Sequence, residues 1–397
     1  MSLPKRSARA CVGKQLDELM TAAGLNPFYS LEINALARHL EAEGRDICFL
    51  EQGQPAAPPA PAVIAAVRRA LEGPQNYTHF AGLPALREAL ALYYSEWHQI
   101  AVSPGNIICT MGSSAAFILA FTGGFAPGTK VAVTRPGYPA YLNTLNGLGY
   151  SAVEIPVTAE AHWRLSAADI ELAFAREPFG GLLFASPANP TGAAVTRDGL
   201  ADIVQTCRRL GVRLISDEIY HGLDFRGAST SAREFGDEAI IINSFSKYYC
   251  MTGWRIGWMV LPDELLRRTQ ILQQNMFIAA PTLSQIAAIA ALGERDYCEA
   301  QKAHYAQNRP LLIGGLRTLG FGVDQGDGAF YAYADASKFT NDSLAFSKEL
   351  LEIAGVATTP GLDFDRIDGN RFVRFSYAGG RETIEKALER LAGFLAR

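Results

Sequence analysis

Three polar side chains follow short apolar runs of the chain at nearly constant spacing. Asn189, Asp217 and Lys247 are separated by 28 and 30 residues. An interval of this length accommodates one strand-helix-strand step, and the carboxyl ends of parallel strands meet at one edge of a sheet. The pattern therefore predicts a cleft that contains an amide, a carboxylate and a primary amine.

The amine of Lys247 determines which chemistry this cleft could perform. A deprotonated lysine is a nucleophile that forms a Schiff base with an aldehyde. Pyridoxal phosphate is such an aldehyde, and it withdraws electrons best when an anion faces its protonated pyridine nitrogen. Asp217 can supply that anion, while Asn189 and Tyr220 can donate hydrogen bonds to the phenolate oxygen of the cofactor.

The phosphate of this cofactor would need hydroxyls, backbone N–H groups and a cation. Ser244 and Arg255 flank Lys247 at positions −3 and +8. The run Gly112-Ser113-Ser114-Ala115 follows an apolar stretch and opens a predicted helix, and a helix N-terminus attracts anions. These segments predict a phosphate site beside Lys247.

Short apolar strands that alternate with amphipathic helices must position these residues. This alternation predicts an α/β fold with a mostly parallel sheet covered by helices on both faces. From about Pro281 the chain changes to long helices and short strands, which indicates a smaller α+β domain. The strands predicted for the sheet are Ile107–Thr110, Lys130–Thr134, Leu182–Ala185, Arg213–Ser216, Ile240–Asn243 and Gly257–Leu261.

Composition excludes several classes of protein. The chain has 397 residues, 49% of them hydrophobic and 19% charged, which is typical of a globular protein with a sizeable core. The net charge of −4 gives no reason to expect a nucleic-acid partner. The cysteines and histidines form no metal-ligand pattern, so we expect no metal and a reduced, cytoplasmic protein. We find neither a signal peptide nor an apolar run of about 20 residues that could span a membrane.

The ordered set of these segments resembles the class I/II aminotransferases, which are fold-type-I pyridoxal-phosphate enzymes. The resemblance extends from Gly53 to the last predicted helix. It implies a seven-stranded, mostly parallel sheet flanked by helices. We expect residues 52–282 to form the large cofactor-binding domain, and residues 1–51 and 283–397 together to form the small domain. The segments that carry the resemblance are Ser244-Phe245-Ser246-Lys247, Met251-Thr252-Gly253-Trp254-Arg255-Ile256-Gly257, Asn189-Pro190-Thr191-Gly192 and Asp217-Glu218-Ile219-Tyr220.

The resemblance also implies a role for each matching residue. Lys247 would form an aldimine with pyridoxal phosphate and move a proton, Asp217 would pair with the pyridine nitrogen, and Tyr220 and Asn189 would bond the 3′-oxygen. Ser113, Ser114, Ser244 and Arg255 would hold the phosphate, with Gly112 and Ser246 beside them, and Tyr138 would stack on the ring. Arg374, Gly53 and Asn189 would bind the substrate carboxylate. Tyr77 would reach the phosphate of the neighbouring subunit, so a homodimer with shared active sites is expected.

The function implied by the resemblance is transfer of an amino group from an L-amino acid to a 2-oxo acid by a ping-pong mechanism. A second enzyme class on the same scaffold, such as a C–S β-lyase, would share Lys247, Asp217 and Arg255, because the protein chooses which bond breaks. A cofactor-binding regulator would need a DNA-binding domain, and the roughly 50 residues before Gly53 show no such pattern. The phosphate run lacks the lysine that favours acidic substrates, and Phe330 and Tyr331 are expected near the substrate side chain. The donor and acceptor stay open.

Overall fold

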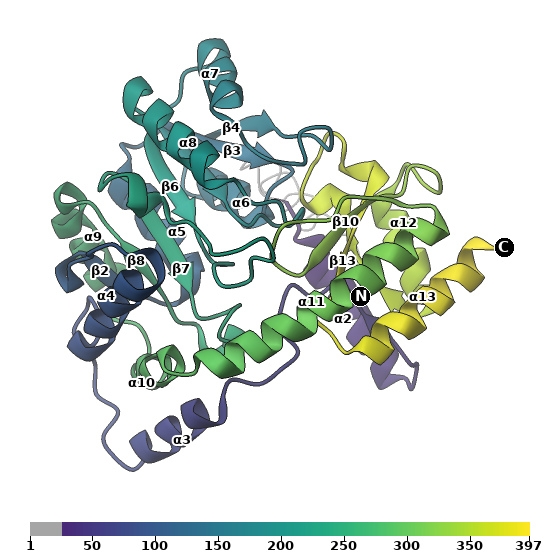
Figure 1. Ribbon diagram of the computed structural model, residues 1–397, viewed down its shortest axis with the longest axis horizontal. Helices are drawn as coiled ribbons and strands as arrows, with labels where there is room; N and C mark the ends of the chain where they lie inside the picture. The colour runs from purple at the N-terminus through teal and green to yellow at the C-terminus, as the bar shows by residue number, and fades with distance from the viewer. Residues whose placement is uncertain (1–25) are drawn as a thin grey trace, which may run out of the picture.

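Seven strands form a central sheet in the order β2-β8-β7-β6-β5-β3-β4 (Figure 1). The computed structural model describes residues 26–397. β8 is antiparallel to both of its neighbours, and the other neighbouring strands are parallel. The mostly parallel seven-stranded sheet expected from the sequence is therefore confirmed. Its strands are β2 (Ile107–Thr110), β3 (Lys130–Arg135), β4 (Ser151–Pro156), β5 (Gly181–Ala185), β6 (Arg213–Asp217), β7 (Ile240–Ser244) and β8 (Gly257–Val260).

The central strands send their side chains into two hydrophobic clusters, one on each face of the sheet. In β7, Ile240 and Ile242 join one cluster and Ile241 joins the other, because successive side chains of a strand point to opposite faces. Helices α5 (Gly112–Gly124), α6 (Pro139–Gly147) and α9 (Asp263–Met276) contribute to the first cluster. Helices α4 (Pro84–His98), α7 (Ala167–Arg176) and α8 (Arg197–Leu210) contribute to the second. Burial on both faces explains why these strands read as continuous apolar runs.

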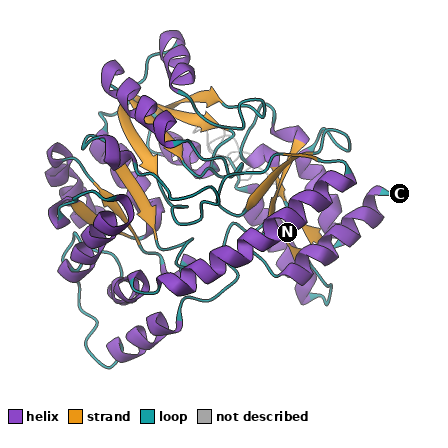
Figure 2. Ribbon diagram, in the orientation of Figure 1, coloured by secondary structure: helices purple, strands orange, loops and turns teal. Residues whose placement is uncertain are grey.

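A second, smaller set of strands lies beside the central sheet (Figures 1 and 2). An antiparallel sheet has the order β12 (Thr359–Pro360), β13 (Phe372–Ser376), β10 (Tyr331–Asp335) and β9 (Gly322–Val323). Next to it, β1 (Cys48–Phe49) pairs in parallel with β11 (Val356–Ala357). The remaining helices are α2 (Tyr29–Ala42), α3 (Pro61–Ala70), α10 (Thr282–Leu292), α11 (Arg295–Leu319), α12 (Ser343–Glu349) and α13 (Arg381–Leu395). The smaller set thus combines segments from both ends of the described chain.

Strand β4 is absent from the sequence-based prediction. Within it Val153 and Ile155 are buried, whereas Ser151 and Pro156 are exposed. Among the described residues, β4 lies at one edge of the sheet and pairs only with β3. An edge strand that alternates buried and exposed residues does not form the continuous apolar run by which the other strands were recognised. The six strands expected for the sheet are all present, with ends that differ by at most one residue.

The expected polar residues gather at one edge of the central sheet. Asn189 follows β5, Asp217 ends β6 and Lys247 follows β7, so parallel strands deliver all three to the same edge. β8 runs in the opposite direction, and therefore Arg255, just before its start, arrives at this edge as well. Within residues 26–397 no helix is both long and apolar enough to cross a membrane.

Candidate active site

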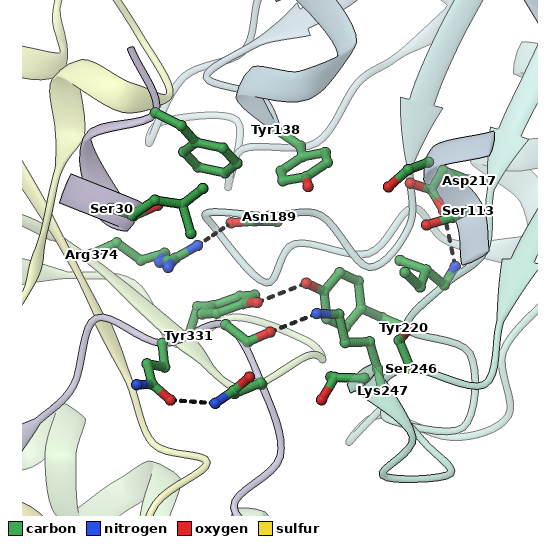
Figure 3. Close-up of a pocket in the computed structure, with 18 of the residues that line it drawn as sticks. Ser30, Ser113, Tyr138, Asn189, Asp217, Tyr220, Ser246, Lys247, Tyr331 and Arg374 are labelled. Carbon is green, nitrogen blue, oxygen red and sulfur yellow. Dashed lines mark hydrogen bonds between the residues drawn. The ribbon is translucent and has the colours of Figure 1, made fainter. Parts of the chain in front are cut away.

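A cavity of about 320 Å³ opens between the carboxyl edge of the central sheet and the antiparallel sheet (Figure 3). Its walls combine side chains from the strand ends of the central sheet with Arg374 of β13 and the segment that follows β1. Residues far apart in the sequence thus meet in one space. The expected site residues that line it are Gly53, Ser113, Ser114, Tyr138, Asn189, Asp217, Tyr220, Ser246, Lys247, Arg255 and Arg374.

Three expected site residues do not line the cavity. Gly112 has φ +71°, and a Cβ at this position would lie 2.6 Å from Nη2 of Arg255, so the missing side chain leaves room for the guanidinium. Ser244 Oγ lies 2.9 Å from the Oγ of Ser246, and Ser246 lines the cavity. Tyr77 is 84% exposed and lies outside the cavity of its own chain.

The carboxylate of Asp217 is buried and held by two donors. The Tyr141 hydroxyl donates to Oδ2, and the backbone N–H of Ile219 donates to Oδ1 at 3.1 Å. Burial raises the pKa of Asp217 to about 6, while both donors and the charge of Lys247 oppose the increase. Sequence reasoning missed Tyr141, which also lines the cavity. Its spacing of three residues from Tyr138 at the start of α6 is the signal that could have identified it.

The amine of Lys247 reaches the cavity from the segment after β7. Its Nζ donates to the backbone carbonyl of Gly53 at 2.6 Å. Burial lowers the pKa of Lys247 to about 8, and the charges of Arg374 and Arg255 lower it further against the attraction of Asp217. A lysine with a lowered pKa is deprotonated more readily near neutral pH than an ordinary lysine, and the deprotonated form is the one required of a nucleophile or a base.

The guanidinium of Arg374 is fixed on two of its edges. Nη1 donates to Oδ1 of Asn189 at 2.8 Å, and Nη2 donates to the carbonyl of Glu51 at 2.6 Å and to Oγ1 of Thr359 at 3.1 Å. Its Cζ lies 4.4 Å from the centre of the Tyr331 ring. A planar cation held in one orientation is suited to bind a carboxylate through two parallel hydrogen bonds. The supporting residues Glu51, Thr359 and Tyr331 come from three separate segments, and only tertiary structure brings them together.

The opposite end of the cavity has the features of an anion site. Ser113 and Ser114 occupy the first turn of the 13-residue helix α5, and both line the cavity. Arg255 and Ser246 lie in the same wall, and Nη1 of Arg255 donates to the carbonyl of Thr252 at 3.0 Å. Helix N-terminal N–H groups, hydroxyls and a guanidinium together favour a phosphate group.

Comparison with known proteins identifies the family. Residues 45–391 match the model of the family "Aminotransferase class I and II". The chain is 44% identical to the valine–pyruvate aminotransferase of Mycobacterium tuberculosis over 385 residues, which are 96% of this chain and 99% of that protein. A crystal structure of an aminotransferase from Mycobacterium tuberculosis superposes with a TM-score of 0.91 at 43% identity, covering 94% and 98% of the two chains. The aspartate aminotransferase of Thermus thermophilus, solved with maleate, has a TM-score of 0.87 at 31% identity and covers 99% and 100%.

The chain therefore belongs to the class I and II aminotransferases. Its fold is the fold of the aspartate aminotransferase structures, and it is an aminotransferase that acts on amino acids and oxo acids. Enzymes of this family generally use pyridoxal phosphate. The expected family, fold class and reaction type are confirmed, and transamination is favoured over a β-lyase reaction.

A second polar cluster surrounds Glu218, the residue that follows Asp217 in the chain. Oε1 of the buried Glu218 accepts hydrogen bonds from Ser216 Oγ at 3.1 Å, Ser231 Oγ at 2.9 Å and the Ala232 N–H at 2.9 Å. Oε2 has no hydrogen-bond partner within residues 26–397 and lies 3.4 Å from Nδ1 of His221. Burial raises the pKa of Glu218 to about 8. The carboxyl group is therefore neutral at pH 7 in the folded protein.

Replacement of Glu218 by glutamine should flatten the dependence of stability on pH. The folded protein holds this proton up to about pH 8, whereas the unfolded chain releases it near 4.5, the ordinary pKa. The resulting stabilisation is complete below about pH 4.5 and is lost as the pH rises to about 8. Because one pKa unit corresponds to about 1.4 kcal/mol, the loss amounts to a few kcal/mol. Thermal unfolding midpoints at about pH 5 and about pH 8 should therefore differ less in Glu218→Gln than in the unmodified protein.

Glutamine resembles protonated glutamic acid in shape, and its side-chain oxygen can still accept the hydrogen bonds from Ser216, Ser231 and the Ala232 N–H. The matched control is Glu88→Gln on the exposed side of α4, which should keep the pH dependence of the unmodified protein. Equal pH dependence in Glu218→Gln and in the unmodified protein would show that Glu218 is ionised in the folded state.

Proposed function

We propose that the protein binds pyridoxal phosphate in this cavity through Lys247 and transfers the amino group of an apolar L-amino acid to a 2-oxo acid. One observation carries the proposal: a lysine amine with a lowered pKa and a hydrogen-bonded carboxylate, Asp217, line the same buried cavity as an orientated Arg374. Few reactions other than those of an aldehyde cofactor require this set of groups.

The donor set fits this cofactor from one end to the other. Arg255 and the N-terminus of α5 meet a phosphate, and a Cβ at Gly112 would displace that guanidinium. Asp217 meets a protonated ring nitrogen, and Lys247 meets an aldehyde. When bound there, pyridoxal phosphate supplies a carbonyl that takes up amino groups and a ring that withdraws electrons from the substrate Cα.

The residues of the chain then have separate tasks. Arg374 binds the substrate carboxylate, and Gly53 adds a backbone contact. Lys247 Nζ takes the proton from the substrate Cα and returns it later in the transfer. Asp217 holds a proton on the ring nitrogen. Oδ1 of Asn189 accepts a hydrogen bond from Arg374, so the side-chain N–H of Asn189 is left to donate to the cofactor. The Tyr220 hydroxyl is the second donor to the cofactor.

Other groups align the ring and the phosphate. Tyr138, Ser113, Ser114 and Ser246 line the cavity, where Tyr138 would stack on the ring and the three serines would contact the phosphate. Ser244 is hydrogen-bonded to Ser246 and would hold it in place. The donor leaves as a 2-oxo acid before the acceptor binds, which is the double-displacement order expected of a ping-pong enzyme. The amino group taken up by the carbonyl group of the cofactor would then pass to the acceptor in exchange for the oxo oxygen of the acceptor, which would leave as an amino acid.

The cavity favours a substrate whose side chain carries no charge. Within residues 26–397 its lining contains three basic side chains, Lys247, Arg255 and Arg374, and each has a task already. No described cation therefore remains for a second carboxylate. Phe28, Leu31 and Ile219 add apolar surface to the walls. The relative that acts on valine and pyruvate supports a branched aliphatic donor and pyruvate as acceptor.

We also propose the domain division at residues 52–282 for the large domain, with 1–51 and 283–397 for the small one. The pairing of β1 with β11 supports the inclusion of the described residues before 52 in the same domain as the C-terminal part, whereas residues 1–25 lie outside the described part of the chain. A cytoplasmic location is supported by the five cysteines among the described residues, which are buried and not linked by disulfides.

We propose that two copies pair and share their active sites. Tyr77, Met111, Met276 and Ile278 are large apolar side chains exposed on one chain. Their segments adjoin, because the Asn76 carbonyl accepts from Thr282 Oγ1 and the Ala81 carbonyl accepts from the Cys109 N–H. A second copy would cover this surface and bring its own Tyr77 to the phosphate end.

The absorption spectrum of the protein tests the proposed reaction. After loading with pyridoxal phosphate, valine alone should remove the visible absorption band, and pyruvate alone should restore it, because each half-reaction is complete without the other substrate. Aspartate should act far more slowly than valine, since no described cation is available for its side chain. Release of pyruvate and ammonia from a single amino acid would instead identify a lyase.

Substitution of Lys247 by alanine should abolish turnover while cofactor still binds through its phosphate. A positioned general acid-base group contributes about 10² to 10⁴ in rate, so the loss should be at least about a hundredfold. Single-turnover kinetics on loaded protein measures this loss. Lys338→Ala, on the surface, is the control and should keep full activity. A Lys247→Ala variant with normal turnover would exclude this lysine from the reaction.

The shared site predicts that Tyr77→Phe weakens cofactor binding although Tyr77 lies outside the cavity of its own chain. A hydrogen bond to a charged group is worth about 1.5–3 kcal/mol, so the Kd for pyridoxal phosphate should rise about tenfold or more. Light scattering should give about twice the chain mass of 42.9 kDa. A monomer mass together with an unchanged Kd would contradict the shared site.

A further inference from the structure

Tyr331 of β10 lies between the two halves of the active site. Its side chain is buried, with 1% exposed, and it lines the cavity. The Tyr331 hydroxyl oxygen is 2.7 Å from that of Tyr220, and the centre of its ring is 4.4 Å from Cζ of Arg374. Figure 3 shows Tyr331 between these two side chains, with its hydroxyl directed to Tyr220.

We propose that Tyr331 is a positioning residue that couples the two halves of the site: its hydroxyl directs the proton of Tyr220 to the cofactor, and its ring supports Arg374 at the substrate carboxylate. The inference rests on the proposed function, which assigns Tyr220 to the cofactor and Arg374 to the substrate. In this inference Tyr331 does not touch the reacting atoms of cofactor or substrate and acts through Tyr220 and Arg374.

The hydroxyl of Tyr331 determines where the proton of Tyr220 goes. Each phenol has one proton, so in the Tyr220–Tyr331 pair only one of the two can be the donor. When Tyr331 donates to Tyr220, the Tyr220 proton is free for the phenolate oxygen of the cofactor. Donors arranged in series polarise one another, so Tyr220 becomes a stronger donor than an isolated tyrosine.

The backbone at Gly53 makes this arrangement possible. A Cβ added at Gly53 would lie 2.5 Å from the Tyr331 hydroxyl oxygen. The same glycine presents its carbonyl to Nζ of Lys247. A glycine at this position therefore allows the tyrosine hydroxyl and the lysine amine to approach one backbone segment from two sides.

The ring of Tyr331 supports the face of the guanidinium, whereas hydrogen bonds hold its edges. Tyr331 and Arg374 lie on neighbouring antiparallel strands in a diagonal relation, since Arg374 is opposite Tyr333 in the register. A cation over an aromatic ring gains energy, particularly where water is excluded. Nη1 and Nη2 of Arg374 donate to Asn189, Glu51 and Thr359, while Nε has no hydrogen-bond partner among the described residues. Two rings contact the guanidinium, Tyr331 at 4.4 Å and Phe364 at 4.8 Å from Cζ, and of these two only Tyr331 also contacts Tyr220.

The charged groups of the cavity are held by other residues, so the hydrogen bond of the Tyr331 hydroxyl is to Tyr220 and not to them. Asp217 is held by Tyr141 and the Ile219 N–H, and Arg255 contacts the carbonyl of Thr252, so neither depends on Tyr331. Removal of the hydroxyl therefore leaves the contacts of Asp217 and Arg255 in place and removes the hydrogen bond to Tyr220. The titratable and charged side chains that line the cavity with Tyr331 are Glu51, Tyr138, Tyr141, Asp217, Tyr220, Lys247, Arg255 and Arg374.

The first experiment titrates the visible band of the loaded protein with pH in Tyr331→Phe and in Tyr333→Phe. In Tyr331→Phe the Tyr220 hydroxyl loses its partner and becomes a weaker donor to the phenolate oxygen of the cofactor. The phenolate then keeps more negative charge, and it holds more tightly the proton on the nitrogen that joins Lys247 to the cofactor. We expect the pH midpoint of the band to rise by about half a unit. Tyr333→Phe removes the hydroxyl of another buried tyrosine two residues along β10, outside the cavity lining, and should leave the midpoint unchanged.

The second experiment measures the binding of isovalerate, a carboxylate without a reactive amino or oxo group, by calorimetry. Tyr331→Phe keeps the ring below Arg374 and should bind isovalerate within about twofold of the unmodified protein, whereas Tyr331→Leu loses the ring and should bind about tenfold more weakly. The same comparison of isovalerate affinities on protein without added cofactor measures the effect of the Tyr331 ring on Arg374 without any effect through Tyr220 and the cofactor.

Two results would overturn the coupling role. One is an unchanged pH midpoint in Tyr331→Phe, and the other is equal isovalerate affinity in Tyr331→Leu and the unmodified protein. Failure of the proposed function has a different signature, because the unmodified protein would then show no visible band after addition of pyridoxal phosphate. In that case the isovalerate comparison still decides whether Tyr331 supports Arg374.

Discussion

The structure depends on keeping a lysine amine and a carboxylate buried in one cavity. Burial disfavours both charges, raising the pKa of Asp217 to about 6 and lowering that of Lys247 to about 8. Near neutral pH the carboxylate is therefore mostly ionised while the amine can release its proton. The hydroxyl of Tyr141, the N–H of Ile219 and the carbonyl of Gly53 offset part of the desolvation cost, so that the two groups remain available for chemistry.

The direction of the strands explains how these groups meet. Parallel strands β5, β6 and β7 end at one edge, and their apolar residues anchor them between two hydrophobic clusters. The antiparallel strand β8 begins at that edge, which places Arg255 beside the N-terminus of α5. A cation and a helix N-terminus thus converge without any long loop, and the site is built on rigid elements.

The smaller antiparallel sheet supplies the other wall, and hydrogen bonds join the two walls directly. Arg374 of β13 donates to Asn189, which follows β5 of the central sheet, and Tyr331 of β10 contacts Tyr220, which follows β6. Any shift of one sheet against the other would change both contacts. Directly after Asp217, the neutral Glu218 accepts hydrogen bonds from Ser231 and the Ala232 N–H, which connects the end of β6 to that segment.

Much of this protein could be predicted from its sequence, because local patterns carry the information. Apolar runs alternating with helices indicate the parallel sheet, and Asn189, Asp217 and Lys247 at strand-helix-strand spacing indicate one cleft. The edge strand β4 was missed because only two of its residues, Val153 and Ile155, are buried, so it forms no continuous apolar run. Tyr141 was missed because its spacing from Tyr138 is a weak signal, and its contact with Asp217 joins residues far apart in the chain.

Contacts between distant segments were decided only by the tertiary structure. Glu51, Thr359 and Tyr331 surround Arg374 from separate strands and loops, and no spacing along the chain records such a meeting. The pKa values of Lys247 and Asp217 likewise follow from burial, which depends on how the two sheets close over the cavity. The sequence by itself determined the family and the chemical types at the site; packing determined their orientation and charge, because both depend on neighbours far away in the chain.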